Sequence, residues 1–208
     1  MTAFPPPERP QRLFIALPLP PSVVRALQRA QLELRAAAGQ PPGVTWTAPR
    51  NLHLTLRFLG RVGPERVAGL VDALRRAVAG QPALELRGAG FGAFPDLHHP
   101  RIIWAGVEAS RDGLAALADA LNSSVAPFAE SPAEATFTAH ITLARIKRPG
   151  RAVADAFARL MAKMSSPQFG AWRADAVELV RSELLPGGSR YTTLVRCPLG
   201  CVSHERTA

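Results

Sequence analysis

The sequence has few of the residues that would signal a covalent framework or a metal cluster. Its 208 residues include two cysteines, Cys197 and Cys201, too few for a disulfide scaffold or a four-ligand zinc site. No stretch approaches the roughly 18 apolar residues of a membrane-spanning helix, and the proline-rich first ten residues hold no apolar signal segment. These absences argue against a secreted disulfide-rich protein or a membrane protein and favour the reducing cytoplasm.

Lysine is also scarce, because it occurs only at positions 147 and 163, so that 23 of the 25 basic residues are arginine (25 − 2 = 23). With 16 acidic residues the formal charge is +9, and a hydrophobic content of 47% indicates a globular chain with a real core. Arginine grips phosphate with two parallel hydrogen bonds, so a nucleic acid or nucleotide partner fits this composition. A general bias towards alanine, arginine and proline would give the same excess, so charge alone does not decide.

The expected secondary structure repeats in the two halves of the chain. The first half predicts strands and helices at 12–17, 22–38, 52–59, 64–79 and 84–87. The second half predicts the same order at 101–107, 111–125, 139–146, 151–163 and 177–180, followed by a last strand at 191–197. An offset that stays near 87 to 93 residues predicts two similar β-α-β-α-β lobes that face each other.

We therefore expect one bilobal domain over residues 12–200. Its lobes would lie near 12–95 and 101–197 and could exchange strands. A flexible proline-rich leader (1–11) and a tail (201–208) would flank the domain. Cys197, Cys201 and His204 are expected to sit in a polar, disordered tail.

One short pattern occurs at the same point of each half, as His53-Leu-Thr-Leu56 and His140-Ile-Thr-Leu143. In a strand each copy places histidine and threonine on one face and two aliphatic side chains on the other. Two histidines at one cleft can supply a general base and a general acid, and two threonine hydroxyls can hold a phosphate. A single histidine in a strand is usually structural, but two matched copies favour catalysis.

These stretches resemble a known family. Arg12-Leu-Phe-Ile-Ala-Leu-Pro18, Asn51-Leu-His-Leu-Thr-Leu-Arg-Phe-Leu-Gly60 and His140-Ile-Thr-Leu-Ala-Arg145 are similar to RNA 2′,3′-cyclic phosphodiesterases, historically called 2′-5′ RNA ligases. These are LigT-like members of the two-histidine phosphoesterase superfamily. The resemblance spans roughly residues 12–197 and departs at Ala139, where the family usually has proline. It implies an α+β fold of duplicated lobes, with two mainly antiparallel sheets facing a central cleft and helices outside.

The resemblance also implies a reaction, the hydrolysis of a terminal 2′,3′-cyclic phosphate to a 2′-phosphate without metal or cofactor. By this similarity His53 would protonate the departing 3′-oxygen, His140 would activate water, and Thr55 and Thr142 would hold the non-bridging oxygens. The residues alone do not say which histidine is the acid. We expect a monomer that acts on RNA ends or nucleotide 2′,3′-cyclic phosphates and does not associate with membranes.

Supporting residues are suggested by position. Strand alternation from His53 places Arg57 on the cleft face as a phosphate ligand. Arg145 resembles a family position, but alternation points it away from the cleft unless the strand bulges. Aromatic rings offer a sequence-tolerant surface for a base or ribose, and the candidates are Phe14, Trp46, Trp104 and Tyr191.

Other functions fit the same residues. The site could act on ADP-ribose 1″,2″-cyclic phosphate or a 2′-5′ oligonucleotide, or run in reverse to join RNA ends. A binding module for RNA ends without turnover would equally fit the charge, although two complete motifs argue for an enzyme. His98-His99 lacks the carboxylates or helical spacing of a metal site, and Gly88-x-Gly-x-Gly92 lacks the full dinucleotide fingerprint.

Overall fold

The computed structural model describes residues 9–38, 43–109, 112–133, 136–147, 151–163, 168–186 and 188–200. Within these ranges the elements are β1 (Gln11–Leu17), α1 (Pro21–Ala38), β2 (Val44–Trp46), η1 (Pro49–Asn51), β3 (Leu54–Val62), α2 (Pro64–Val78), β4 (Leu84–Phe94), β5 (Ile102–Ala109), α3 (Gly113–Val125), η2 (Ala126–Phe128), β6 (His140–Ile146), α4 (Arg151–Lys163), β7 (Gln168–Ala174), β8 (Ala176–Leu185) and β9 (Gly188–Pro198). The η elements are short 3₁₀ helices.

All strands join one antiparallel sheet in the order β7-β4-β5-β6-β3-β1-β8-β9, with β2 paired to β6. The α+β class is confirmed. The two sheets that we expected meet edge to edge between β3 and β6, where a single residue pair, Leu54 with Ile141, joins them. The result is one curled sheet with two halves rather than two separate sheets.

The two halves of the sheet exchange strands. The strand β4, which belongs to the first half of the sequence, pairs with β5 and β7 of the second half. In return, β8 pairs with β1 and carries β9 at its outer side. Each half of the sheet is therefore built from both halves of the chain.

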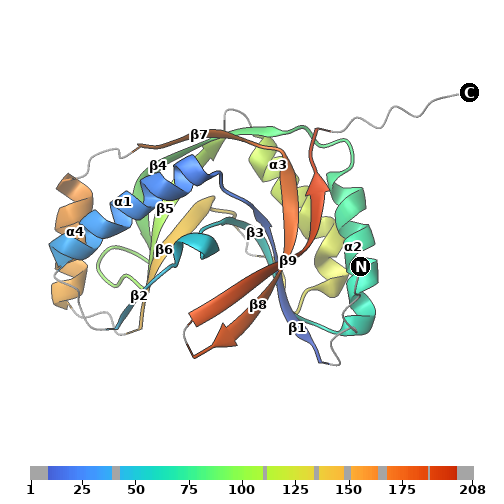
Figure 1. Ribbon diagram of the computed structural model, residues 1–208, viewed down its shortest axis with the longest axis horizontal. Helices are drawn as coiled ribbons and strands as arrows, with labels where there is room; N and C mark the ends of the chain where they lie inside the picture. Colours follow the sequence, from blue (N-terminus) through green and yellow to red (C-terminus); the bar gives the residue numbers. More distant parts are fainter. Residues whose placement is uncertain are drawn as a thin grey trace, which may run out of the picture.

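The helices cover the convex side of the sheet as two pairs. Helix α1 packs on α4 at one end of the molecule, and α2 packs on α3 at the other (Figure 1). The sequence of α2 explains how such a helix packs on the sheet. Pro64 lies at the start of the helix, where the N–H that proline lacks would have no partner, and the buried residues of the helix recur at helical spacing. These are Leu70, Ala73, Leu74, Ala77 and Val78. None of these four helices covers the concave face of the sheet.

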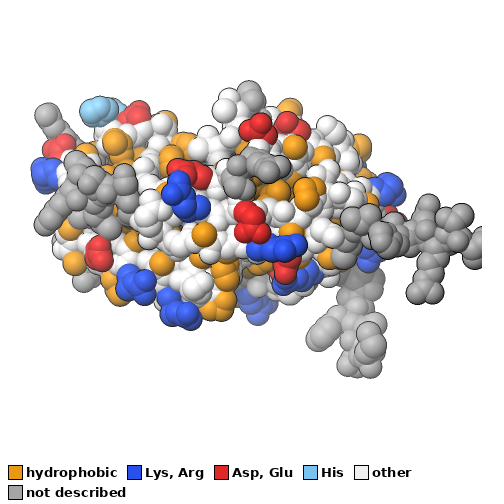
Figure 2. Space-filling model, turned by 90° about the horizontal axis from the view of Figure 1, so that it is seen from above, with side chains coloured by type: hydrophobic (Ala, Val, Ile, Leu, Met, Phe, Trp, Pro, Cys, Tyr) orange, Lys and Arg blue, Asp and Glu red, His pale blue; other side chains and the backbone are white. Residues whose placement is uncertain are grey.

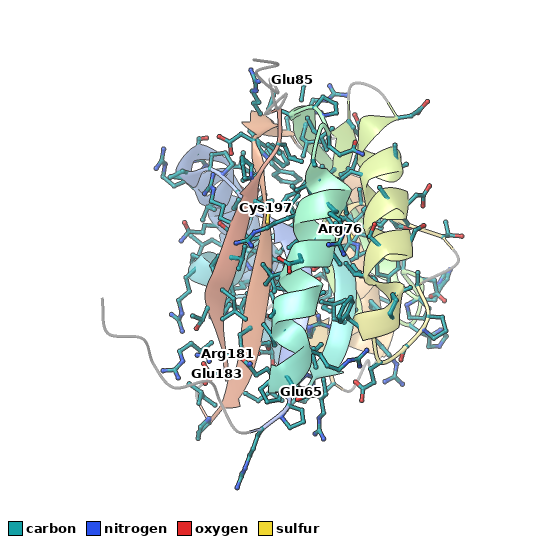
Figure 3. The ribbon with its side chains drawn as sticks, turned by 90° about the vertical axis from the view of Figure 1, so that its right-hand side faces the viewer. Glu65, Arg76, Glu85, Arg181, Glu183 and Cys197 are labelled. Carbon is teal, nitrogen blue, oxygen red and sulfur yellow. The ribbon has the colours of Figure 1, made fainter. Side chains whose placement is uncertain are left out.

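Every strand and helix expected from the sequence is present. Most ends differ by a few residues, but β4 runs to Phe94 where the expected strand ended at 87, and β8 runs to Leu185 where it ended at 180. The strands β2 and β7 were not expected, because β2 has only three residues and β7 contains Gly170 at positive φ, which weakens a strand pattern. The prediction for Cys197 is wrong: it lies in β9, 2% exposed and facing α2 (Figure 3), and burial raises the pKa of its thiol. Cys201 and His204 lie outside the described residues.

Among the helices that the structure describes, each is too short or too polar to cross a bilayer.

Candidate active site

The two histidine motifs lie side by side where the halves of the sheet meet. Leu54 of β3 pairs with Ile141 of β6 in antiparallel register, and the sequence offset between these two residues equals that between the motifs. Continuing this register by one residue in either direction sets Thr55 across from His140. By the same step, His53 lies across from Thr142. Each threonine therefore neighbours the histidine of the other motif.

Both imidazoles are held in the same way. The ring nitrogen Nδ1 of His53 donates to the carbonyl of Asn51 at 2.6 Å, and Nδ1 of His140 donates to the carbonyl of Thr138 at 2.8 Å. A carbonyl can only accept, so each bond fixes the proton on Nδ1 and leaves Nε2 for the cleft. At His53, Nε2 lies 2.9 Å from the hydroxyl of Thr55, which donates to it when the ring is neutral.

The surroundings of His53 lower its pKa from 6.5 to about 4. Burial is the main cause, because it penalises the charged ring, and the positive charges of Arg145 and His140 act in the same direction. The hydrogen bond to Asn51 opposes the shift. In the unliganded protein His53 is therefore neutral at pH 7, with the lone pair of Nε2 directed at Thr55.

A β-bulge follows each histidine motif and changes which side chains reach the cleft. The pairing of β3 with β1 skips Leu56, and the pairing of β6 with β5 skips Leu143, three residues after each histidine. The bulge in β6 brings Arg145 to the cleft face with His140, which is the condition that the expectation for Arg145 required. The residue of β3 equivalent to Arg145 is Phe58.

Arg57 is turned towards the loop that precedes β6. It is 7% exposed, and its guanidinium donates to the carbonyls of Pro132 at 2.9 Å and Ser131 at 2.5 Å. It lines a cavity of about 270 Å³ together with Thr55, Asn122 and His140. Arg57 thus lies near the motifs, but two of its donors are held by the protein, and its role as a phosphate ligand stays a prediction.

Aromatic rings flank both histidines. Phe14 and Tyr191 lie against His53, with ring centroids 4.8 and 5.3 Å away. Phe94 lies 5.0 Å and Trp104 6.1 Å from the ring of His140. Phe14 is 3% exposed and Tyr191 is partly exposed, and both rings line the two larger cavities next to the motifs.

Phe94 was missed from the sequence because its strand, β4, was expected to end at residue 87 and to belong to the other lobe. The expectation that Trp46 contacts a base is wrong. Its ring packs on Phe157 of α4 at 6.2 Å and under the guanidinium of Arg35 of α1, on the helix-covered side of the sheet.

Two larger cavities adjoin the motifs on the concave face. One of about 720 Å³ is lined by His140, Thr142 and Arg145, with Tyr191 and Phe58 at its walls. The other, of about 490 Å³, is lined by His53 and shares only Phe14 and Tyr191 with the first. The two histidines thus face different cavities across a common centre.

In the described part of the chain, no three or more His, Cys, Asp and Glu side chains gather in a group that could hold a metal ion. His98 and His99 are exposed in a turn, where their backbone N–H groups donate to the carboxylate of Asp96. Acidic and basic side chains are interspersed on the face seen in Figure 2, so the excess positive charge does not form one patch there.

Comparison with known proteins agrees with this geometry. The family described as LigT like Phosphoesterase matches residues 17–104 and again residues 106–191, so that each segment contains one histidine motif. A Methanothermobacter thermautotrophicus protein named RNA 2′,3′-cyclic phosphodiesterase is 31% identical over 183 residues, or 88% of this chain and 96% of its own length. A protein of the same name from Thermus thermophilus is 34% identical over 194 residues, 90% of either chain.

Solved structures show the same fold. The crystal structure of Escherichia coli LigT in apo form superposes with a TM-score of 0.72 at 28% identity, covering 93% of this chain and 99% of that one. The same protein complexed with 3′-AMP gives a TM-score of 0.69 at 29% identity, covering 92% and 99%. With a duplicated sheet, paired His-x-Thr motifs and a family match over most of its length, this chain belongs to the LigT-like phosphoesterases.

Proposed function

We propose that this protein hydrolyses terminal 2′,3′-cyclic phosphates of RNA or nucleotides to 2′-phosphates by acid–base catalysis with His53 and His140, without a metal ion. The name of the relatives supports this substrate class, and the 3′-AMP complex of LigT indicates that a nucleotide fits such a cleft. The proposal extends these properties to this chain because its own site has matching chemistry.

The observation that carries the proposal is the matched pair of imidazoles. Each is fixed through Nδ1 to a carbonyl two residues earlier, so each presents Nε2 to the space between β3 and β6. In the proposed complex a phosphorus atom held between the two rings would have one nitrogen on each side, which is the arrangement that an in-line displacement needs. The hydroxyls of Thr55 and Thr142 are neutral donors that would hold its non-bridging oxygens.

In the proposed reaction the neutral Nε2 of His140 takes a proton from water, and the water oxygen forms the new bond to phosphorus. The P–O3′ bond breaks on the opposite side, and Nε2 of His53 gives its proton to the departing 3′-oxygen. The product is a 2′-phosphate, and proton exchange with solvent restores both rings.

The low pKa of His53 makes its role depend on substrate. The free ring is neutral at pH 7, but a phosphate anion beside Nε2 favours the charged form and offsets the burial that disfavours it. The two imidazoles then hold one proton between them, on either side of the bound phosphate. His53 therefore carries the proton for the leaving oxygen only when substrate occupies the cleft.

The test is turnover of 2′,3′-cyclic nucleotides and of an RNA that ends in a cyclic phosphate, in the presence of EDTA. We expect 2′-phosphate as the product. Replacing either histidine, His53→Ala or His140→Ala, should lower kcat/KM by roughly 10²–10⁴-fold, because each would transfer a proton in the transition state. The double variant should lose less than the product of the two single losses.

Three results would contradict the proposal. Loss of activity with EDTA would show metal dependence, and a loss of less than tenfold in either variant would remove that histidine from the chemistry. RNA-end binding that survives both substitutions, without turnover by the intact protein, would favour a binding module. ADP-ribose 1″,2″-cyclic phosphate and 2′-5′ oligonucleotides belong in the same substrate panel, because the same two imidazoles would cleave them.

A further inference from the structure

The cavity of about 490 Å³ next to His53 combines apolar and charged walls. Ala16 and Val180 line it together with Tyr191, and charged side chains of both signs, Glu178, Arg25 and Arg50, line it as well. A carboxylate opposes a phosphate at its own position but accepts hydrogen bonds from N–H groups, so the part of a substrate that binds directly at Glu178 should be a neutral hydrogen-bond donor.

The strand register places Glu178 directly in line with the catalytic centre. Ala16 of β1 pairs with Thr55 of β3 on one side and with Glu178 of β8 on the other. Successive strands lie about 4.8 Å apart, so the Cα atoms of Thr55 and Glu178 are separated by roughly 10 Å. Because Ala16 between them is small, the space above it is open. A ribose and its base fit this span when the phosphate lies at Thr55.

Glu178 is held rather than free. Its side chain is 17% exposed, its Oε2 accepts the hydroxyl of Thr193 at 3.0 Å, and its Oε1 lies 3.6 Å from the guanidinium of Arg196. A carboxylate offers about four acceptor positions, so two remain for a ligand in the cavity. The two contacts also fix the plane of the carboxylate, as a residue that recognises a planar partner requires.

We propose that Glu178 recognises guanine, and that this cavity receives the terminal nucleoside of the cyclic phosphate. The inference rests on the proposed function. In the proposed reaction the leaving oxygen belongs to the terminal ribose, and His53 would protonate it. His53 lines this cavity, whereas His140 does not. Guanine presents two adjacent donors, N1–H and N2–H, to a carboxylate, whereas uracil presents one between two carbonyl oxygens.

The experiment compares kcat/KM for the 2′,3′-cyclic phosphates of guanosine, inosine and uridine. For the wild-type protein we expect guanosine to exceed uridine by about tenfold or more, since one bidentate contact discriminates by that order. Inosine lacks the N2 amino group and should fall between them. In Glu178→Gln the ratio of guanosine to uridine should drop by about tenfold, because guanine loses a two-donor contact and uracil at most a single one.

Glu183→Gln is the matched control, because it removes the same charge from the same strand. Glu183 lies beside Arg181 (Figure 3) and pairs with Arg181 and Arg190. It does not line this cavity, so its substitution should leave the guanosine-to-uridine ratio unchanged.

A wild-type protein that treats guanosine, inosine and uridine alike would overturn the inference, as would an unchanged ratio in a folded Glu178→Gln. If that variant does not fold, the comparison of guanosine with inosine on the wild-type protein decides. Uridine turnover reports on the proposed function separately: its absence together with that of every other cyclic nucleotide would contradict the function itself.

Discussion

At the scale of single residues, the two histidines have equivalent hydrogen bonds but different surroundings. Both donate through Nδ1 to a carbonyl two residues earlier, which follows from the repeated motif. His53 is in addition enclosed by Phe14 and Tyr191, and this enclosure gives it a pKa of about 4. A symmetric motif has thus produced two chemically distinct imidazoles, which is what a reaction with one acid and one base requires.

The pH dependence of kcat/KM should reflect this difference. The pair of imidazoles must keep one unprotonated Nε2, and Nε2 of His53 takes up a proton only near pH 4, so the acidic limb of the profile should have its midpoint near 4 rather than near 6.5. The measurement is kcat/KM for a cyclic nucleotide from pH 3.5 to 9. A midpoint between 6 and 7 would contradict the buried state of His53.

Folding must be followed over the same pH range. In the unfolded chain His53 has its ordinary pKa of 6.5 and takes up a proton first as the pH falls. The contribution of the neutral ring to stability is therefore complete above 6.5 and is lost as the pH falls towards 4. Circular dichroism at each pH separates loss of fold from loss of base.

Tyr191 offers a direct test of the cause of the shift. Tyr191→Ala removes the ring that lies edge-on to His53, so burial should penalise the charged imidazole less and the acidic limb should move from about 4 towards 6.5. Tyr191→Phe keeps the ring and should keep the limb in place. A limb that stays near pH 4 in Tyr191→Ala would assign the shift to other neighbours.

At the scale of elements, the centre of the sheet depends on how two splayed strands are held. β3 and β6 share one residue pair and then diverge. On one side the short strand β2 fills the gap by pairing with β6, and Gln31 of α1 donates to the carbonyls of Thr47 and Leu143, both at 2.9 Å. On the other side, the segment 131–133 is the counterpart of β2 in the second half of the chain, 87 residues later. It would pair with β3 as β2 pairs with β6, but Pro132 has no N–H to donate.

Arg57 takes the place of that missing strand pairing. Its guanidinium reaches the carbonyls of Ser131 and Pro132, so Arg57→Met should leave two carbonyls without donors and reduce the free energy of unfolding by roughly 2–4 kcal/mol. Urea denaturation measures this loss. Arg61→Met, an exposed position on the same strand, should change it by less than about 0.5 kcal/mol.

The same variant separates the two roles of Arg57. If Arg57 is purely structural, Arg57→Met should lower the free energy of unfolding with little change in KM for a cyclic nucleotide. If Arg57 binds the phosphate, the variant should also raise KM. An unchanged free energy of unfolding in Arg57→Met would show that other contacts hold the segment 131–133.

How far the sequence predicts these elements depends on the range of the interactions that form them. Hydrophobic periodicity is local, so the strands, the helices and the duplicated order are recognisable, as are His53 and His140. The bulges at Leu56 and Leu143 arise from pairing with β1 and β5, which no local pattern records. The bulge in β6 brings Arg145 to the cleft face, where strict alternation would not place it.

At the scale of the whole molecule, strand exchange makes the two halves interdependent. The first half of the chain supplies β4 to the sheet of the second, and the second supplies β8 and β9 to the sheet of the first. The two histidine motifs lie at the joint between the halves of the sheet, so the geometry of the candidate site depends on both halves. The sequence repeat predicts two lobes but does not reveal this exchange, because strand order within a sheet is a long-range property.

The exchange predicts that the described domain unfolds as one unit. Neither half can complete its sheet alone, so calorimetry should give a single transition whose calorimetric and van't Hoff enthalpies agree. Cleavage in the exposed turn around Asp96, at an engineered protease site, should leave both fragments associated and active, because the paired strands hold them together. Either fragment expressed alone should not fold, whereas co-expression should restore turnover. Two separate transitions, or a first fragment that folds by itself, would show instead that the lobes are independent and that the active centre forms by docking of finished halves.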